Sequence, residues 1–433
     1  MDVTKRFAKY VSQNIAGMIG VSCYIIVDTF FISIAAGANG ITVLNLALPI
    51  FNLIFAIGSM TGVGSATRFA ILRARKEKSD YLFFNAVAWV IIIGLIFTLA
   101  GIFIPDKIIR IMGGDESIVQ LGIPYNRIFL LFSPFFMLNY VVSSFVRNDN
   151  DTLRAMIGTV IGSISNIILD YIFMFPMKMG LAGAALATAA SPVISILICS
   201  THFLSSKNTI RLEIIKPSIK QLIKSWQLGI SAFVGEMTSG VTTTIFNLLI
   251  LGIAGNVGVA AYGVVANFSL IAVSVFNGIS QGAQPLISEC FGKKEKNSQK
   301  RLLFMSIVLS LVIAIAMNIG IYAFTGNLVE LFNSEHSVLL SEYAYKGLRL
   351  YFTGFLFAGI NIICSGYFSA TDSPLYAFII SILRGFVTLA ACSVILSKIM
   401  GFTGVWISFT VSEGITALIT FMLLMFGSRG NKE

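Results

Sequence analysis

The sequence predicts an all-α integral membrane protein with twelve transmembrane helices, arranged as two pseudo-symmetric lobes of six helices. Three observations predict this fold. The 433 residues are 56% apolar and 12% charged, with a mean hydropathy of +0.87, whereas an average soluble domain is about 25% charged. Residues 81–105 and 302–325 carry no charge, and about 20 apolar residues suffice to cross a bilayer as a helix. Segments of the first half also recur in the second.

The runs are too long for a membrane β-barrel, whose strands alternate over about 10 residues. The basic net charge of +10 does not indicate nucleic-acid binding, because the basic residues are confined to short loops and the chain ends, as membrane topology requires. The five cysteines lie mostly in apolar stretches without metal-ligand spacing, so we expect them to be small hydrophobic side chains. No cofactor is predicted.

The spans follow one another along the chain with alternating loop charge. They are centred near residues 24, 58, 93, 133, 163, 192, 239, 270, 313, 356, 386 and 414. Basic side chains gather before the first span, after the second, fourth, sixth and eighth spans, and at the end of the chain, in residues 5–9, 73–78, 147–154, 207–224, 293–301 and 429–432. Opposite loops, such as 35–43 and 252–260, carry no charge. Since cytoplasmic loops are enriched in Lys and Arg, we expect a multi-pass protein of the cell inner (cytoplasmic) membrane with both termini in the cytoplasm.

An internal repeat divides the chain into two halves. At a nearly constant offset of about 218 to 222 residues, four segments of the first half match segments of the second in the same order: 32–40 with 251–259, 75–78 with 293–296, 141–157 with 363–379, and 180–186 with 401–407. This predicts an N-terminal six-helix lobe (1–204), a basic cytoplasmic linker (205–224) and a C-terminal six-helix lobe (225–433). Six spans are an even number, so both halves share one orientation, as in transporters that rock two parallel repeats around a central site.

Few ionisable residues fall inside the predicted spans, and each is costly there, by about 2.5 kcal/mol or more. Asp28 and Asp170 are short carboxylates in mid-span, which favours a functional role. Glu236 is the clear acid of the second half, and either a cationic substrate, a second proton or an interhelical hydrogen bond explains it. Four further residues are expected to lie near helix ends and to extend toward water: Arg68, His202, Arg384 and Glu413.

Asn166 and Asp170 are four residues apart, so they share one face of a helix. Their oxygens suit a hard cation such as Na⁺, and a carboxyl group in a low dielectric can also exchange a proton. Thr188 on the next span, within the small-residue segment GAALATAA, can add a hydroxyl. The repeat supports a functional role, because it places Phe246, Thr388 and Cys392 opposite Asp28, Asn166 and Asp170. The acidic cluster therefore belongs to the first half alone.

Five segments together resemble the multidrug and toxin extrusion (MATE) family, nearest to its MepA-like bacterial branch: YIIVDTFFIS, SFVRNDNDTLRAMIG, NIILDYIF, GLAGAALATAAS and GISQGAQPLISECFGKKEK. The resemblance runs from about residue 10 to 427. It implies a fold of two six-helix lobes, export of organic cations and drugs in exchange for Na⁺ or H⁺, and an N-lobe cation site formed by Asp28, Asn166, Asp170 and Thr188. It also implies a cation or substrate role for Glu236. The chain departs from many relatives in having no proline before Pro49, so a proline kink in the first helix is not expected.

The predicted function is therefore a cation-coupled antiporter, with H⁺ or Na⁺ as the coupling ion and small organic cationic or amphipathic molecules as substrates. Its expected surroundings are membrane lipids, and we expect a monomer. A lipid-linked oligosaccharide flippase of the same superfamily is the alternative. A channel would have less reason for two unlike halves. An enzyme is not predicted, because the sequence contains no HExxH or GxSxG motif and only two histidines.

Overall fold

The computed structural model describes residues 3–214, 216–332 and 337–429, and its regular structure there is helical. The first half forms α1 (Val3–Ala74), α2 (Tyr81–Phe103), α3 (Pro105–Ile111), α4 (Glu116–Leu131), α5 (Ser133–Asn148), α6 (Thr152–Met174), α7 (Gly180–Ser200) and the short 3-10 helix η1 (Thr201–Leu204). The second half forms α8 (Ile219–Gly292), α9 (Lys296–Glu330), α10 (Val338–Phe352), α11 (Phe355–Ala370), α12 (Pro374–Ile382), the π-helix η2 (Leu383–Val387) and α13 (Thr388–Arg429). Lys432, one of the basic residues predicted to be cytoplasmic, lies outside the described residues.

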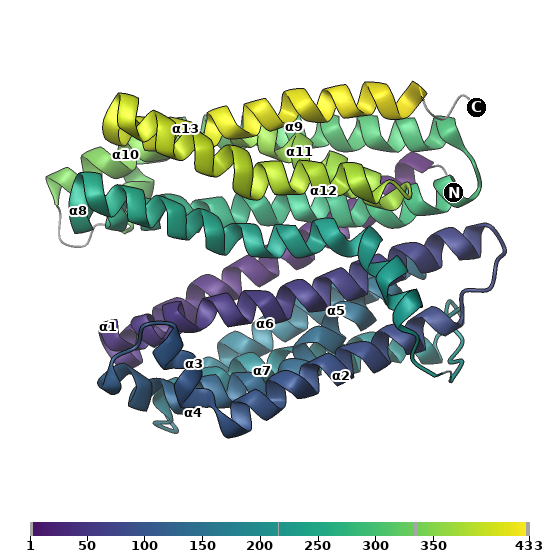
Figure 1. The fold of residues 1–433 in the computed structure, drawn as a ribbon, viewed down its shortest axis with the longest axis horizontal. Helices are drawn as coiled ribbons and strands as arrows, with labels where there is room; N and C mark the ends of the chain where they lie inside the picture. The colour runs from purple at the N-terminus through teal and green to yellow at the C-terminus, as the bar shows by residue number, and fades with distance from the viewer. Residues whose placement is uncertain (1–2, 215, 333–336, 430–433) are drawn as a thin grey trace.

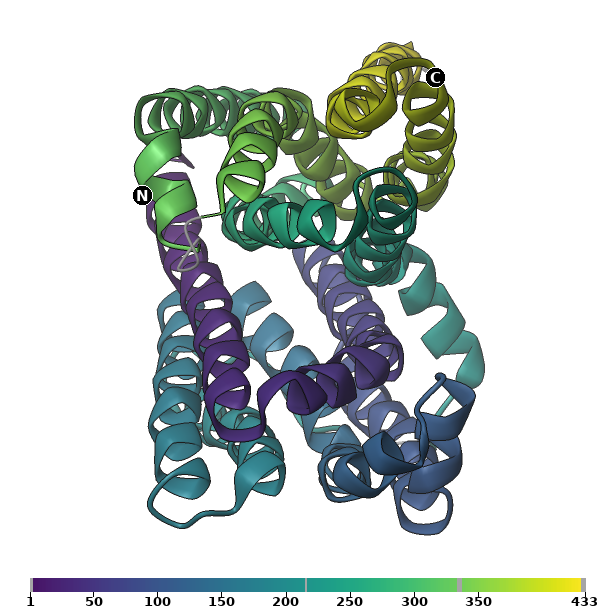
Figure 2. The ribbon, with the colours of Figure 1, turned by 90° about the vertical axis from the view of Figure 1, so that its left-hand side faces the viewer.

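Glycines break the longest helices. A straight helix as long as α1, with 72 residues, would extend about 108 Å, far beyond a hydrocarbon core of about 30 Å. Gly37 in α1, Gly255 in α8 and Gly401 in α13 have φ of 59°, 63° and 58° with ψ of −152°, −159° and −136°. This conformation is essentially restricted to glycine. At each break the chain turns back toward the other face of the bundle (Figure 2).

The described residues contain eight helices that are long and apolar enough to cross a bilayer. Two bent pairs, α4–α5 with 42° and α10–α11 with 45°, raise this number to ten. Residues 219–292 and 374–425 each contain one of the glycine breaks, and dividing them there gives twelve spans. Every span centre predicted from the sequence falls in one of these segments. The bends within the α4–α5 and α10–α11 spans were not predicted.

The backbone repeats along with the sequence. Gly37 and Gly255 are 218 residues apart, and Gly180 and Gly401 are 221 residues apart; all four have positive φ. Non-glycine residues with positive φ also recur at these offsets, in the pairs Lys76 with Lys294 and Asn150 with Asp372. Turns that require an unusual backbone conformation therefore occupy matching places in the two halves.

The helices form two lobes, with α1–α7 below and α8–α13 above in Figure 1. One hydrophobic core cluster consists of first-half side chains between Ile32 and Ile210. Another consists of second-half side chains between Phe246 and Phe409, joined by Phe7, Tyr10 and Val11 from the start of α1. The first helix therefore begins within the packing of the second lobe. The start of α1 and the end of α13 lie at the same end of the molecule (Figure 1), as an even number of spans requires.

The lobes meet where α1 crosses α8, and glycines allow close approach there. A methyl group at Gly229 would lie 2.0 Å from the backbone oxygen of Met60, and one at Gly64 would lie 2.1 Å from the backbone oxygen of Ser225. In the second crossing, Gly278 and Gly282 pack in the same way against the backbone of residues 10–15. Both crossings lie in the half of the molecule that contains the start of α1.

Candidate functional site

Asn166 and Asp170 lie on the buried face of α6, and both side chains are completely buried. The neighbouring helix α7 comes close because small residues line the contact. A methyl group at Gly162 would lie 3.1 Å from the backbone oxygen of Ser191, and one at Gly183 would meet the backbone of Phe173 at 2.9 Å. This close packing brings the Thr188 segment of α7 against the polar face of α6.

The Asn166 amide links the two helices. In the orientation that satisfies both ends of the amide, its nitrogen donates to Oδ2 of Asp170 at 3.1 Å and its oxygen accepts from the backbone N–H of Thr188 at 3.2 Å. The Thr188 hydroxyl lies 3.5 Å from the same amide group. The structure therefore brings these three predicted site residues together in one polar cluster.

Asp28 joins this cluster from α1. Its side chain is buried, and its carboxyl group lies within hydrogen-bonding reach of the carboxyl group of Asp170. The Oδ1 atoms of both aspartates are buried and have no hydrogen-bond partner among the described residues. Two carboxylates so close together repel each other in a low dielectric, so a proton or a metal cation between them is required to offset the repulsion.

The donor set fits a proton or Na⁺ better than a transition metal. The described residues contain no group of three or more His, Cys, Asp and Glu side chains that could hold a metal ion. Around Asp28 and Asp170 the further polar atoms are an amide and a hydroxyl, and oxygen ligands of this type suit hard cations.

Tyrosines connect the acidic pair to Glu236, a connection that the sequence did not indicate. The Tyr140 hydroxyl of α5 donates to Oε1 of Glu236 in α8 at 3.3 Å. Tyr24 lies one helical turn before Asp28 and interacts electrostatically with Asp28, Asp170 and Glu236. The spacing of Tyr24 and Asp28 by four residues was the available signal. Glu236 does form an interhelical hydrogen bond, and this bond crosses between the lobes.

The prediction that His202, Arg384 and Glu413 extend to water is wrong. His202 is 0% exposed and Glu413 is 2% exposed. Arg384 Nε lies 2.8 Å from Glu413 Oε1 within the second lobe, and Asn361 donates to Glu413 Oε2 at 2.7 Å. Opposite charges on helices far apart in sequence satisfy each other there, so neither side chain needs water. Arg68 is half-buried and donates to the backbone oxygen of Gln221 at 3.2 Å.

Comparison with known proteins agrees with this architecture. The family model described as MatE matches residues 15–172 and 232–395, one segment in each half of the chain. The chain belongs to the MatE family. This is a family of membrane transporters and not of enzymes.

Relatives of the MatE family match over nearly the whole chain. "Multidrug export protein MepA" of Staphylococcus saprophyticus is 27% identical over 406 residues, covering 93% of this chain and 89% of the relative. Its counterpart in Staphylococcus aureus (strain MRSA252) is 28% identical over 405 residues, with the same coverage of both chains. The chain is therefore a multi-pass membrane protein of this transporter family, as the resemblance of its motifs implied.

Solved MATE structures share the fold. One, described as the "outward-facing conformation of a multidrug resistance MATE family transporter of the MOP superfamily", superimposes with a TM-score of 0.93 at 22% identity, covering 100% of this chain and 98% of the other. A second, a MOP superfamily transporter from Pyrococcus furiosus described by the "reverse polarity" of its binding pocket, has a TM-score of 0.92 at 21% identity and covers 100% and 97%. The all-α, two-lobed fold predicted from the sequence is confirmed.

Proposed function

We propose that this MatE-family protein is an antiporter that exports organic cations and amphipathic drugs across the cytoplasmic membrane by alternating access, in exchange for H⁺ or Na⁺. The observation that carries the proposal is the meeting of Asp28 and Asp170, whose carboxyl groups approach each other while one oxygen of each has no partner. A buried pair of this kind requires a positive charge to complete it. The multidrug export activity in the name of the MepA relatives supports the choice of substrate class.

Binding of the coupling cation would move α1. With a cation between them, Asp28 of α1 and Asp170 of α6 attract the same charge and draw their helices together; without it they repel. Because α1 begins in the core of the second lobe, at Phe7 and Tyr10, its displacement changes how the lobes pack. One unit charge moving through 100 mV releases about 2.3 kcal/mol, which supports a roughly fifty-fold gradient of a neutral substrate.

The substrate would bind where Tyr24, Tyr140 and Glu236 meet. A cationic organic molecule gains there from the Glu236 charge and from the faces of aromatic rings. Tyr140 lies in the first lobe and Glu236 in the second, so a molecule between them contacts both lobes. Tyr24 interacts electrostatically with both acidic groups, so substrate and coupling cation influence each other through charge.

The proposed cycle starts from the state in which the predicted cytoplasmic side is closed. Arg6 binds Glu289 across the lobes at 2.7 Å, Arg147 donates to Gln281, and Arg301 donates to Thr4 at 2.9 Å. The glycine crossings of α1 and α8 lie on the same side. These contacts must separate for a drug to enter from the cytoplasm, and they re-form after its release outside.

A lipid-linked oligosaccharide flippase remains the alternative, but the polar groups do not favour it. Such a substrate carries negatively charged phosphates, which basic side chains would have to bind. The cluster between the lobes instead contains Asp28, Asp170 and Glu236, which would repel phosphate groups. We further propose that the protein acts as a monomer in the inner membrane with both termini in the cytoplasm, as the distribution of basic loops indicates.

Transport by purified protein in liposomes tests the function. Ethidium is the probe, and a Na⁺ gradient or a pH gradient is imposed separately. We expect one of the two gradients to drive ethidium movement at least about tenfold above protein-free liposomes, and we expect Asp28→Asn and Asp170→Asn to abolish the effect of that gradient. Glu342→Gln is the matched control, because Glu342 is exposed and pairs only locally with Lys346.

The outcomes separate the hypotheses clearly. Ethidium movement that responds to neither gradient would overturn the antiport mechanism. Transport that remains gradient-driven in both aspartate variants would remove Asp28 and Asp170 from the coupling role, while leaving multidrug export itself in place.

A further inference from the structure

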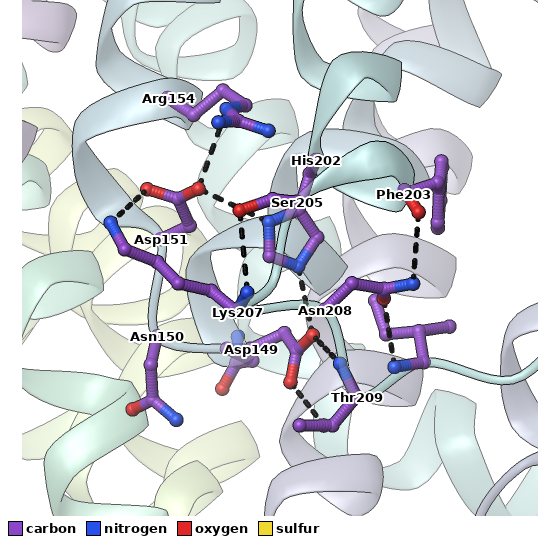
Figure 3. A network of polar contacts seen from close by, with 12 residues as sticks. Asp149, Asn150, Asp151, Arg154, His202, Phe203, Ser205, Lys207, Asn208 and Thr209 are labelled. Atoms are coloured by element: carbon purple, nitrogen blue, oxygen red, sulfur yellow. Dashed lines mark hydrogen bonds and ion pairs between the residues drawn. The ribbon is translucent and has the colours of Figure 1, made fainter.

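A second polar cluster lies at the end of the first lobe where the linker begins. We call it the linker clasp; it consists of Arg73, Asp149, Asp151, Arg154, His202, Lys207 and Thr209 (Figure 3). Asp149 and Asp151 lie in the turn between α5 and α6, and His202 follows α7 in η1. None of these side chains belongs to the proposed transport site.

His202 bridges the two aspartates. Its Nε2 lies 2.8 Å from Oδ2 of Asp149 and its Nδ1 lies 3.1 Å from Oδ2 of Asp151. The imidazole is completely buried, so water does not compete for these bonds. An ionised carboxylate only accepts hydrogen bonds, so both ring nitrogens must carry a hydrogen for both contacts to be favourable. This geometry requires the imidazolium form of His202.

The other charged groups of the cluster bind the same carboxylates from outside. Arg73 of α1 contacts Oδ1 of Asp149. Lys207 of the linker lies 3.4 Å from Oδ1 of Asp151, and Arg154 of α6 lies 3.4 Å from its Oδ2. Each of these cations contacts one aspartate, whereas His202 alone contacts both.

The clasp fastens the linker to the first lobe. Asp149 accepts from the backbone N–H of Thr209 at 2.7 Å and from its hydroxyl group. Further along, Lys78 pairs with Glu213 at 2.7 Å, and Asn85 accepts from the backbone N–H of Ser218 at 2.7 Å. Since α8 begins at Ile219, the linker is held against the first lobe up to the residue before the second lobe starts.

The same contacts hold α6 and α7 together at one end. Asp151 is the residue before α6 and His202 lies two residues after α7, and these are the helices that contribute Asn166, Asp170 and Thr188 to the candidate site. We propose that protonated His202 is a positioning residue, which sets the spacing of α6 and α7 at the predicted cytoplasmic end and fastens the linker, so that loss of its proton releases both. A deprotonated ring nitrogen would face a carboxylate as acceptor against acceptor.

Nitrogen-15 NMR of histidine-labelled protein tests the protonation state directly. The chain contains two histidines, His202 and His336, so the variant His336→Gln leaves a single imidazole. We expect both ring nitrogens of His202 to show imidazolium shifts at pH 7, and Asp149→Asn to remove that signature. A spectrum of a neutral imidazole at pH 7 would overturn the proposal, and this measurement does not depend on the transport function.

Trypsin cleavage of the linker tests its release. Lys207 and Arg211 are the target sites, and the basic loop 293–296 of the same chain is the internal reference for protease activity. We expect the ratio of linker cleavage to reference cleavage to rise at least about threefold from pH 7 to pH 8.5. His202→Gln should give the high ratio at both values, and His202→Arg, which stays charged, should give a low ratio at both. Equal ratios in wild type and His202→Gln would contradict the fastening role.

Discussion

A buried carboxyl group in a membrane-spanning helix costs free energy that its surroundings must offset, and Asp170 has few neighbours able to do so. Asn166 donates one hydrogen bond to its Oδ2, while Oδ1 has no partner among the described residues. Asp28 offers it a second carboxyl group and not a positive charge. At the scale of single residues the site is therefore incomplete in a way that a small cation would complete.

The hydroxyl group of Thr188 should tune the affinity for that cation. Thr188→Val keeps the shape of the side chain but removes the hydroxyl that lies 3.5 Å from the Asn166 amide. A polar contact of this type is worth about 0.5–1.5 kcal/mol, so we expect about three- to tenfold weaker half-saturation by the coupling ion in ethidium transport. Thr188→Ser is the control and should remain within about twofold of wild type; identical half-saturation in Thr188→Val would exclude the hydroxyl from the site.

Asp149 should stabilise the fold in a pH-dependent way. Burial disfavours its charged form, but hydrogen bonds from His202 and Thr209 outweigh burial and hold the pKa of Asp149 below its ordinary value. Its ionised form therefore contributes fully above the ordinary pKa of about 3.9, and this contribution is lost as the pH falls through the lowered value. We expect Asp149→Asn to reduce the free energy of unfolding by about 2 kcal/mol between pH 5 and 7.

Thermal unfolding in detergent measures this difference. The melting temperatures of wild type and Asp149→Asn should differ by a constant amount between pH 5 and 7 and should converge only below about pH 4. Convergence already at pH 6 would mean that Asp149 is not the ionised acceptor of the clasp.

The residue-scale predictions from the sequence succeeded where they depended on one helix. The spacing of Asn166 and Asp170 placed both on one face of α6, and both are buried there. Contacts between helices were harder to predict, because they depend on which spans become neighbours. The approach of Asp28 to Asp170, the Tyr140–Glu236 bond and the Arg384–Glu413 pair all join residues of different helices.

At the scale of elements, hydropathy and loop charge were sufficient to locate the spans, since each span is a long apolar run. The glycine turns at Gly37 and Gly255 were visible as a sequence repeat, although their shared positive φ was not. The 42° bend between α4 and α5 has a local cause, because Pro134 at the start of α5 has no backbone N–H to donate. Hydropathy averaged over a whole span does not register such a bend.

The crossing of α1 and α8 should not tolerate larger residues. A methyl group at Gly229 would lie 2.0 Å from the backbone oxygen of Met60, whereas Gly263 of the same helix α8 has no atom within 4 Å of the corresponding position. We expect Gly229→Ala to destabilise the closed arrangement of the lobes by about 1–3 kcal/mol. Gly263→Ala is the matched control, and we expect its effect to be small.

Thermal stability and labelling of an engineered cysteine on the cytoplasmic side of the crossing would both report this change. Gly229→Ala should lower the melting temperature and increase labelling, and Gly263→Ala should change neither. Equal behaviour of the two variants would show that the crossing is not a close contact between the lobes.

At the scale of the whole molecule, two similar lobes carry unlike chemistry. The repeat preserves turns at matching positions, yet Phe246, buried in the second core, occupies the place that corresponds to Asp28. The sequence repeat predicted this asymmetry, because scaffold residues recur in both halves while the acidic residues do not. It did not predict that α1 would begin in the core of the opposite lobe, since that packing depends on the whole fold. Through α1, a charge bound in the first lobe is connected mechanically to the second.

Ion release on drug binding tests the central claim most directly. Ethidium is added to purified protein in weakly buffered detergent solution, and H⁺ and Na⁺ are measured with an indicator dye and a selective electrode. We predict release of one of these ions by wild type, and ethidium binding without release by Asp28→Asn and Asp170→Asn. Binding of ethidium by wild type with no release of either ion, or equal release by wild type and both variants, would contradict the account.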